Sequence, residues 1–192
     1  MDIDDYLNRQ LPHRLNAIDI AVLMLKFQLK WEEPKPMEIY VDGVLQFDGL
    51  TTMFTNSTVE NGVLHARALL EFVGLKVQGE QLVQLDSKRR HPDDAAIEKL
   101  VGALGKLSMV SPSDAGALYP TDKEGAKIAL ANLILAAHKG LAHASASYFL
   151  NPADAKEVLF ALQLTKQIVV HYVYARLEKV LPDSPIKPRK RV

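Results

Sequence analysis

Two polar residues, Asn61 and His65, stand one helical turn apart within the apolar segment 60–75, ENGVLHARALLEFVGL. At 100° per residue they fall in the main apolar stripe of the helix that this segment predicts, together with Leu64 and Leu69. A buried imidazole needs partners for both ring nitrogens. His65 is therefore either a general base or ligand contact that faces a pocket, or a core histidine held by Asn61 and a backbone carbonyl.

Three charged residues, Glu60, Arg67 and Glu71, form a narrow ridge between the apolar faces of the same helix. Arg67 and Glu71 are four residues apart, so their side chains can pair along the helix for about 0.2–0.5 kcal/mol. The ridge is either a solvated strip, since exposed pairs contribute little, or it presents an arginine to a phosphate or carboxylate.

A second polar stripe, formed by Asn132, Lys139 and His143, lies in the apolar segment 128–149. Lys139 and His143 are one helical turn apart, and a lysine beside a histidine lowers the pKa of both groups. Such a pair suits anion binding or acid–base chemistry. The alternative is that the stripe is simply the side on which this helix meets water.

The sequence contains no motif for a metal or a cofactor. His138 and His143 are separated by about 140° around a helix, whereas two ligands of one ion need the same face. The chain has no cysteine, no His-Glu-x-x-His or Glu-x-x-His, no glycine-rich phosphate loop and no Gly-x-Ser-x-Gly. We therefore predict no metal site and no cofactor, although a three-histidine site from His65, His143 and another helix is geometrically allowed.

Composition bounds the class of protein further. The 192 residues suit one domain, and 23 basic residues balance 23 acidic ones. A protein that wraps nucleic acid usually has a basic excess, so nucleic acid is a partner that net charge does not favour. The acidic N-terminus is not a signal peptide, and the polar residues of segment 128–149 argue against a membrane span. We expect a cytoplasmic protein.

Hydrophobic periodicity and turn residues predict a mainly α fold: a single-domain helical bundle of four to five helices with a small β-hairpin appendage. Segment 60–75 is apolar on two sides, so it is expected at the centre of the bundle. We expect helices at 13–31, 50–73, from Asp93 or Asp94 to 107, 121–149 and 151–181, a hairpin at 37–47, a short strand at 81–85, and a loop at 108–119.

The ends of the chain are expected to carry little structure. Residues 1–12 resemble a loose start, and the helical-bundle domain is predicted to span residues 1–181. Residues 182–192 contain Pro182, Pro185 and Pro188 and end in KPRKRV, which predicts a flexible basic C-terminal tail.

Two short sequence segments, HARALLEF (65–72) and GLAHAS (140–145), resemble segments of a group of uncharacterised, mostly bacterial helical proteins. That group is similar to the HEPN (higher eukaryotes and prokaryotes nucleotide-binding) helical bundles. The resemblance implies that His65, Arg67 and Glu71 share one functional helix and that His143 and Ser145 lie on its partner. Many HEPN proteins are RNases with an arginine followed, after four to six residues, by a histidine. This chain departs from that pattern, because only three residues separate Arg9 from His13, Arg67 has no histidine soon after it, and Lys166 precedes His171.

These features together predict a HEPN-like bundle that binds a protein partner or a small ligand such as a nucleotide, without recognisable catalysis. The alternative is an RNA-directed nuclease with a non-standard site made from His65, Arg67, Lys139 and His143. Either protein could self-associate through an apolar helix face.

Overall fold

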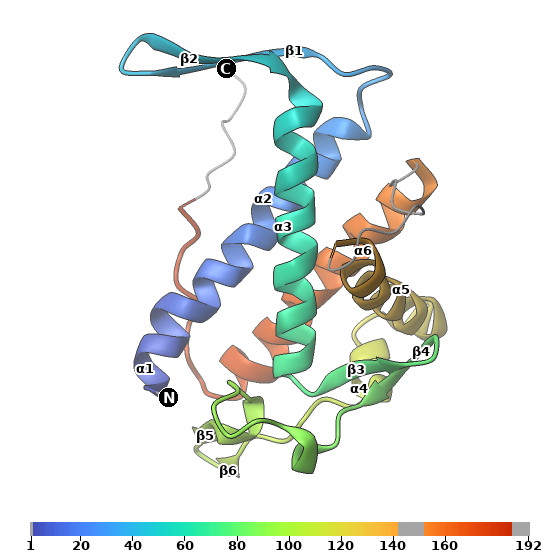
Figure 1. The fold of residues 1–192 in the computed structure, drawn as a ribbon. Helices are drawn as coiled ribbons and strands as arrows, with labels where there is room; N and C mark the ends of the chain where they lie inside the picture. Colours follow the sequence, from blue (N-terminus) through green and yellow to red (C-terminus); the bar gives the residue numbers. More distant parts are fainter. Residues whose placement is uncertain (1, 142–151, 186–192) are drawn as a thin grey trace.

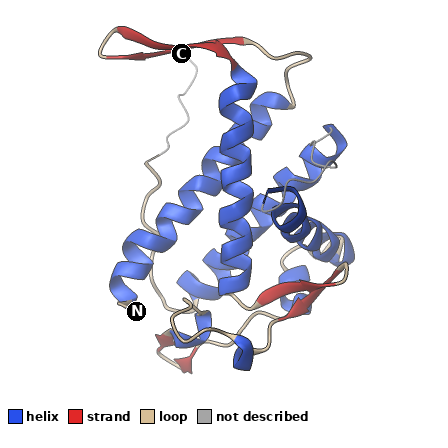
Figure 2. Ribbon diagram, viewed as in Figure 1, coloured by secondary structure: helices blue, strands red, loops and turns tan. Residues whose placement is uncertain are grey.

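The computed structural model describes residues 2–141 and 152–185, and the fold is mainly α (Figures 1 and 2). Its α-helices are α1 (Ile3–Asp5), α2 (Leu11–Gln28), α3 (Thr51–Phe72), α4 (Pro112–Ala117), α5 (Lys123–Leu135) and α6 (Pro152–Val169). Three short π-helical segments adjoin these helices: η1 (Tyr6–Gln10) precedes α2, η4 (Ala136–Leu141) follows α5, and η5 (Val170–Ala175) follows α6. Two 3-10 turns are η2 (Ser87–Arg89) and η3 (Ile97–Lys99).

The strands form separate two-stranded antiparallel hairpins. They are β1 (Pro36–Val41) with β2 (Val44–Leu50), β3 (Leu75–Gln78) with β4 (Gln81–Gln84), and β5 (Val101–Gly102) with β6 (Gly105–Lys106). Figure 1 shows β1–β2 at one end of α3 and the other two hairpins at the opposite end.

Helices α2 and α3 pack closely along much of their length, and both also contact α6. Gly62 makes the close approach possible, because a Cβ there would collide with the Cβ of Ala21 and lie 3.3 Å from the carbonyl oxygen of Ala17. The small residues on the two helices therefore set how near the backbones come.

Helix α3 has α2 on one side and α5, η4 and α6 on another, as its central place predicts, although its buried residues form one continuous broad face. The buried residues are Thr51, Thr55, Val59, Gly62, Val63, Ala66, Leu69, Leu70 and Phe72. Leu64 and Asn61, placed in the main apolar stripe from sequence, are exposed. Periodicity identified the apolar residues, but it does not say which arc of a helix its neighbours will cover.

The last helix confirms most of its predicted core stripe. Val158, Leu162, Val169 and Val173 are buried, whereas Val180 is exposed because the helical turns end near Ala175. The buried phenol of Tyr174 donates a hydrogen bond to the Leu7 carbonyl oxygen at 2.7 Å, which ties this end of the chain to the N-terminal turn.

The predicted hairpin at 37–47 is present and runs from Pro36 to Leu50. Asp42 and Gly43 both have positive φ (52° and 79°), as a two-residue turn of type I′ requires. The expectation that the hairpin lies on the bundle is wrong, since it projects beyond the helices (Figure 1).

Three other local predictions are corrected. The expected helix from 93 or 94 to 107 is replaced by η3 and the β5–β6 hairpin, whose turn ends at Gly105 with φ 103°. The expected loop at 108–119 contains α4, which begins with a capping box between Ser111 and Asp114. The expected loose start is α1 and η1, which bury Tyr6 and Leu7.

The helix expected to be capped by Thr121 is capped instead by Asp122, whose carboxylate accepts from the Gly125 amide at 2.8 Å, and begins at Lys123. It continues through η4 to Leu141, and its expected extension to residue 149 lies outside the described residues. The same is true of residues 186–192 of the expected tail.

One helical stretch, Asp154–Ala175, has the length and mean hydropathy (1.2) that a membrane span requires. Of its most apolar window, 56% is buried among the other elements. One such helix is weak evidence for a span, because a core helix of a globular protein meets the same criteria.

Candidate functional site

The polar residues predicted on α3 lie along its outward side and near its C-terminal end. His65 faces α2, where the Arg14 side chain lies with one guanidinium nitrogen (Nη1) 3.2 Å from His65 Nδ1. Because a guanidinium only donates, Nδ1 must be the accepting nitrogen and the ring is neutral, with its proton on Nε2. The predicted partners, Asn61 and a backbone carbonyl, are therefore replaced by an arginine 51 residues earlier.

A second histidine, His13, completes this cluster. Its ring stands edge-on to that of His65, with centroids 5.6 Å apart. Partial burial, and next the Arg14 guanidinium and then His13, lower the pKa of His65 below its ordinary value of 6.5. His65 is thus held neutral by its surroundings.

The predicted pair of Arg67 and Glu71 is confirmed, with Nε and Oε1 3.1 Å apart. His138, from η4, brings its Nε2 to 3.7 Å from the same carboxylate oxygen. Glu71 therefore lies between two cationic or potentially cationic side chains. His138 had been considered at the sequence level only as a metal ligand.

Arg90 closes the C-terminal end of α3. Its Nη2 donates to the carbonyl oxygens of Glu71 (2.9 Å) and Phe72 (3.2 Å) in the last turn of the helix, and the Glu71 oxygen also accepts from the Gly74 amide (3.0 Å). Its Nε lies 2.8 Å from Glu98 Oε1, and only 8% of the arginine side chain is exposed. A buried cation at a helix C-terminus is favourable because the carbonyl dipoles point toward it.

A pocket of about 360 Å³ opens between these groups. It is lined by Tyr6, Arg14, Ala68, Glu71, Phe72, Lys76, Leu85, Arg90, Asp94 and Ala95. The sequence elements that meet here are η1, α2, the end of α3, β3 and the segment after β4. Three cationic side chains face two carboxylates in this pocket.

The floor of the pocket is aromatic. The rings of Tyr6 and Phe72 are 5.2 Å apart and both residues are buried. Burial raises the pKa of Tyr6 to about 12, with smaller opposing effects from Arg14 and Arg90, so its phenol stays protonated at neutral pH.

The second predicted stripe is not brought to this pocket by the described residues. Asn132 is exposed and donates from Nδ2 to Glu157 Oε1 at 2.6 Å, which links α5 to α6. Lys139 falls in η4, but its side chain lies outside the described part of the structure, as do His143 and Ser145 entirely. The alternative nuclease site made from His65, Arg67, Lys139 and His143 therefore stays a prediction.

Several residues of the site were missed by sequence reasoning. Tyr6, Arg14 and Lys76 carry no local signal, because their meeting depends on contacts between distant elements. Arg90 belongs to the basic run Lys88–His91, which was a usable signal. Within residues 2–141 and 152–185, no group of three histidine, aspartate or glutamate side chains could hold a metal ion.

Comparison with known proteins found no relative: no family model, curated protein or solved structure matches the chain. The class defined so far is a mainly α protein with a mixed-charge pocket at the end of its central helix.

Proposed function

We propose that the chain is a single-domain, HEPN-like helical bundle of the cytoplasm that binds a small phosphate-bearing ligand without catalysis. A nucleoside monophosphate is the ligand class that the pocket fits. The observation that carries the proposal is the placing of Arg14, Lys76 and Arg90 around one pocket at the C-terminal end of α3.

The charges of the pocket leave a positive excess for a ligand. Glu71 is offset by Arg67, and Arg90 is offset by Glu98. Arg14 contacts a neutral imidazole, and Lys76 makes no ion pair within the described residues. Among the residues that line the pocket, only the carboxylate of Asp94 is left to balance the positive charges of Arg14 and Lys76. An anion is therefore the complementary ligand.

The size and lining of the pocket support the same class. A volume of about 360 Å³ lies at the lower end of the range for small-molecule sites, roughly 300–1,000 Å³. Ala68 and the aromatic floor offer apolar contact, while the phenol of Tyr6 is a neutral donor at any physiological pH. A ligand with one apolar part and one phosphate would contact the apolar lining with the first and accept a hydrogen bond from the Tyr6 phenol with the second.

Isothermal titration of the full chain with adenosine monophosphate, guanosine monophosphate and inorganic phosphate tests the proposal. We expect a nucleotide to bind, and Arg14→Gln or Lys76→Gln each to weaken it about tenfold or more, since a charge-assisted hydrogen bond contributes about 1.5–3 kcal/mol. Inorganic phosphate measures how much of the affinity comes from the phosphate alone.

Lys30→Gln is the matched control, because Lys30 is an exposed lysine on the turn after α2 and does not line the pocket. Its affinity should equal that of the wild type. Absence of heat at millimolar ligand, or equal affinity in the Arg14→Gln and Lys30→Gln variants, would rule out this pocket as the binding site.

A second candidate function, metal-independent RNA cleavage, is favoured by one observation. His13 and His65 form a pair of imidazoles beside an arginine, a set that could take a 2′-hydroxyl proton and protonate the leaving oxygen. However, Arg14 occupies the free lone pair of His65, so this histidine can act as a base only after Arg14 has moved. This contact is why binding is the leading proposal.

Incubation of the purified chain with mixed RNA in the presence of a chelator distinguishes the two functions. Cleavage that disappears in both His13→Ala and His65→Ala would establish the nuclease. Intact RNA at high protein concentration would dismiss it and leave the binding proposal unaffected.

A further inference from the structure

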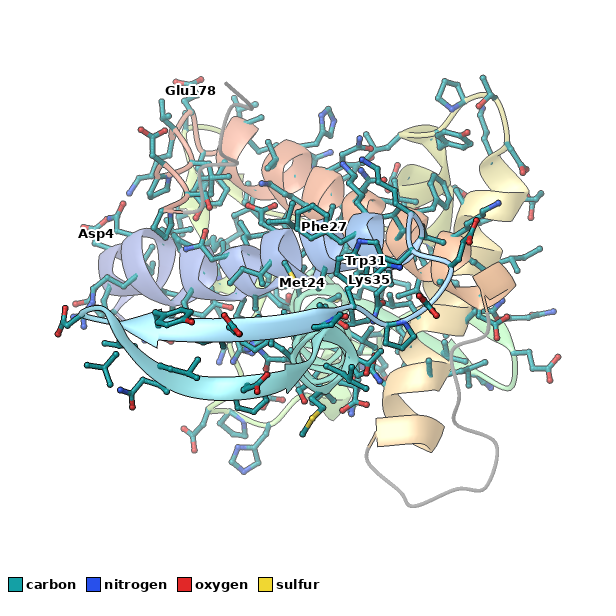
Figure 3. All side chains as sticks on the ribbon, turned by 90° about the horizontal axis from the view of Figure 1, so that it is seen from above. Asp4, Met24, Phe27, Trp31, Lys35 and Glu178 are labelled. Atoms are coloured by element: carbon teal, nitrogen blue, oxygen red, sulfur yellow. The ribbon has the colours of Figure 1, made fainter. Side chains whose placement is uncertain are left out.

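The β1–β2 hairpin and its turn, residues 36–50, form an arm that has little cover. Tyr40, Val41, Val44 and Leu45 are between 46% and 58% exposed, although each is large and apolar. Figure 3, seen from above, shows no described element lying over the two strands. Tyr40 stands opposite Leu45 and Val41 opposite Val44, so each face of the hairpin carries one of these apolar pairs. A lone two-stranded hairpin is marginally stable in water and needs packing against another element.

The charges of the arm are all of one sign. It carries Glu38, Asp42 and Asp48 and has no lysine or arginine. Glu38 and Asp48 stand directly opposite each other in the β1–β2 register. Like charges at directly opposite positions destabilise a sheet, so this pair lowers the stability of the hairpin by itself.

No cation of the described chain relieves this pair. Lys35, at the base of the arm, pairs with Glu33 at 3.4 Å. Glu38 accepts a hydrogen bond from the Tyr40 hydroxyl at 2.8 Å, which is a neutral donor. The cation that would complement Glu38 and Asp48 must therefore come from outside the described residues.

The backbone of the arm also offers bonding groups. The sheet contains only β1 and β2, and within the described residues no other backbone segment pairs with the outer edge of either strand. An exposed edge is a template for an added strand. Main-chain bonds supply affinity in such complexes, and alternate side chains supply specificity.

From these three observations we propose that the arm binds a basic, extended peptide segment of another protein, which adds a strand to the hairpin. Its apolar side chains cover Val41, Val44 and the residues beside them, and its lysine or arginine side chains lie against Glu38 and Asp48. A second copy of this chain fits less well, because two arms would bring six carboxylates and no cation together. This site is separate from the pocket at the other end of α3.

The test uses a blocked seven-residue peptide of alternating valine and lysine, titrated into the full chain and followed by fluorescence anisotropy. The same peptide with glutamate in place of lysine is the opposite-charge probe. We expect only the lysine peptide to bind, with affinity that falls as salt rises. The double variant Glu38→Gln/Asp48→Asn should weaken it about five- to tenfold, from the loss of two exposed charge pairs.

The double variant Glu80→Gln/Asp183→Asn removes two exposed acids outside the arm and should bind like the wild type. Val44→Ser tests the apolar part against Leu104→Ser, an exposed leucine in the β5–β6 turn, and only the first should weaken binding. Amide hydrogen exchange should slow along one outer edge of the arm when the peptide is bound.

Equal affinity for the two peptides, or no loss of affinity in Glu38→Gln/Asp48→Asn, would overturn the proposal. So would a dimer of the chain alone in sedimentation velocity that Val44→Ser dissociates, because the arm would then be a contact between copies. Binding without protection of either edge would exclude strand addition.

Discussion

The two ends of α3 differ in how their polar groups are satisfied. At the C-terminal end, Arg90 bonds the last carbonyls and pairs with Glu98, while Arg90 Nε, Glu98 Oε2 and His138 Nε2 are buried without a hydrogen bond. At the N-terminal end, α3 begins at Thr51, its cap residue Leu50 provides no side-chain hydrogen bond, and the preceding hairpin sets Glu38 opposite Asp48. The first end places its charged groups around a pocket, whereas the second end leaves the opposed Glu38 and Asp48 without a cation among the described residues.

The largest contrast should appear in the free energy of unfolding when an apolar side chain is shortened at each end. Leu69→Ala removes a fully buried side chain of α3 and should cost about 3 kcal/mol. Val44→Ala, in the arm, should cost less than about 0.5 kcal/mol because the side chain is exposed. Urea denaturation measures both, and a cost for Val44→Ala close to that for Leu69→Ala would mean that the arm is packed within the chain.

Arg90→Met should be the next largest change, because it removes the hydrogen-bond partner of the Phe72 carbonyl, one of the partners of the Glu71 carbonyl, and the cation beside Glu98. We expect a loss of about 2 kcal/mol in the free energy of unfolding. Lys179→Met is the control, since Lys179 pairs with exposed Asp4 at 2.9 Å and such pairs contribute little. Equal midpoints for the two variants in urea would show that Arg90 does not hold this end of α3.

A smaller effect should depend on pH. The folded chain lowers the pKa of His65, so the unfolded chain takes up the proton more readily. The contribution of His65 to the free energy of unfolding should therefore be fully present above about pH 6.5. It should be lost as pH falls from about 6.5 through the lowered pKa of the folded chain. Urea midpoints at pH 7.5 and 5.0 should differ less in His65→Gln than in the wild type.

His91→Gln is the control for that measurement, because His91 is an exposed histidine in the same half of the chain. It should keep the pH dependence of the wild type. If His65→Gln kept it as well, the Arg14–His65 contact would not influence stability.

The smallest effect should come from the pair that the sequence predicted. Arg67→Gln removes a partly exposed bond to Glu71 and should cost about 0.2–0.5 kcal/mol. Arg9→Gln, which removes an exposed pair with Asp5, should cost no more. A loss above 1 kcal/mol for Arg67→Gln would indicate that Arg67, Glu71 and His138 act as one coupled network.

Local patterns were enough to predict the main helices and the first hairpin. The apolar period of 60–75 and the Asp42-Gly43 turn each act over a few residues, where backbone sterics decide the outcome. The expected helix ending at 107 failed because Gly102 and Gly105 permit a tight turn that helical propensity alone does not weigh.

The candidate site was predicted in part, for a related reason. Arg67 and Glu71 pair within one helix, so their spacing sufficed. His65 has the right chemistry, but its partner Arg14 comes from α2 and was not predicted. Contacts between side chains far apart in sequence depend on how helices pack, and no local pattern encodes that.

The sequence by itself determined that the chain is mainly α, that a hairpin precedes the central helix, and that Arg67 and Glu71 share one face. Only the tertiary structure decided which side of α3 is buried, where Arg14, Lys76 and Arg90 meet, and that the arm stands free. The physical reason is that periodicity fixes positions around one helix axis, whereas burial is set by the neighbours that pack against it.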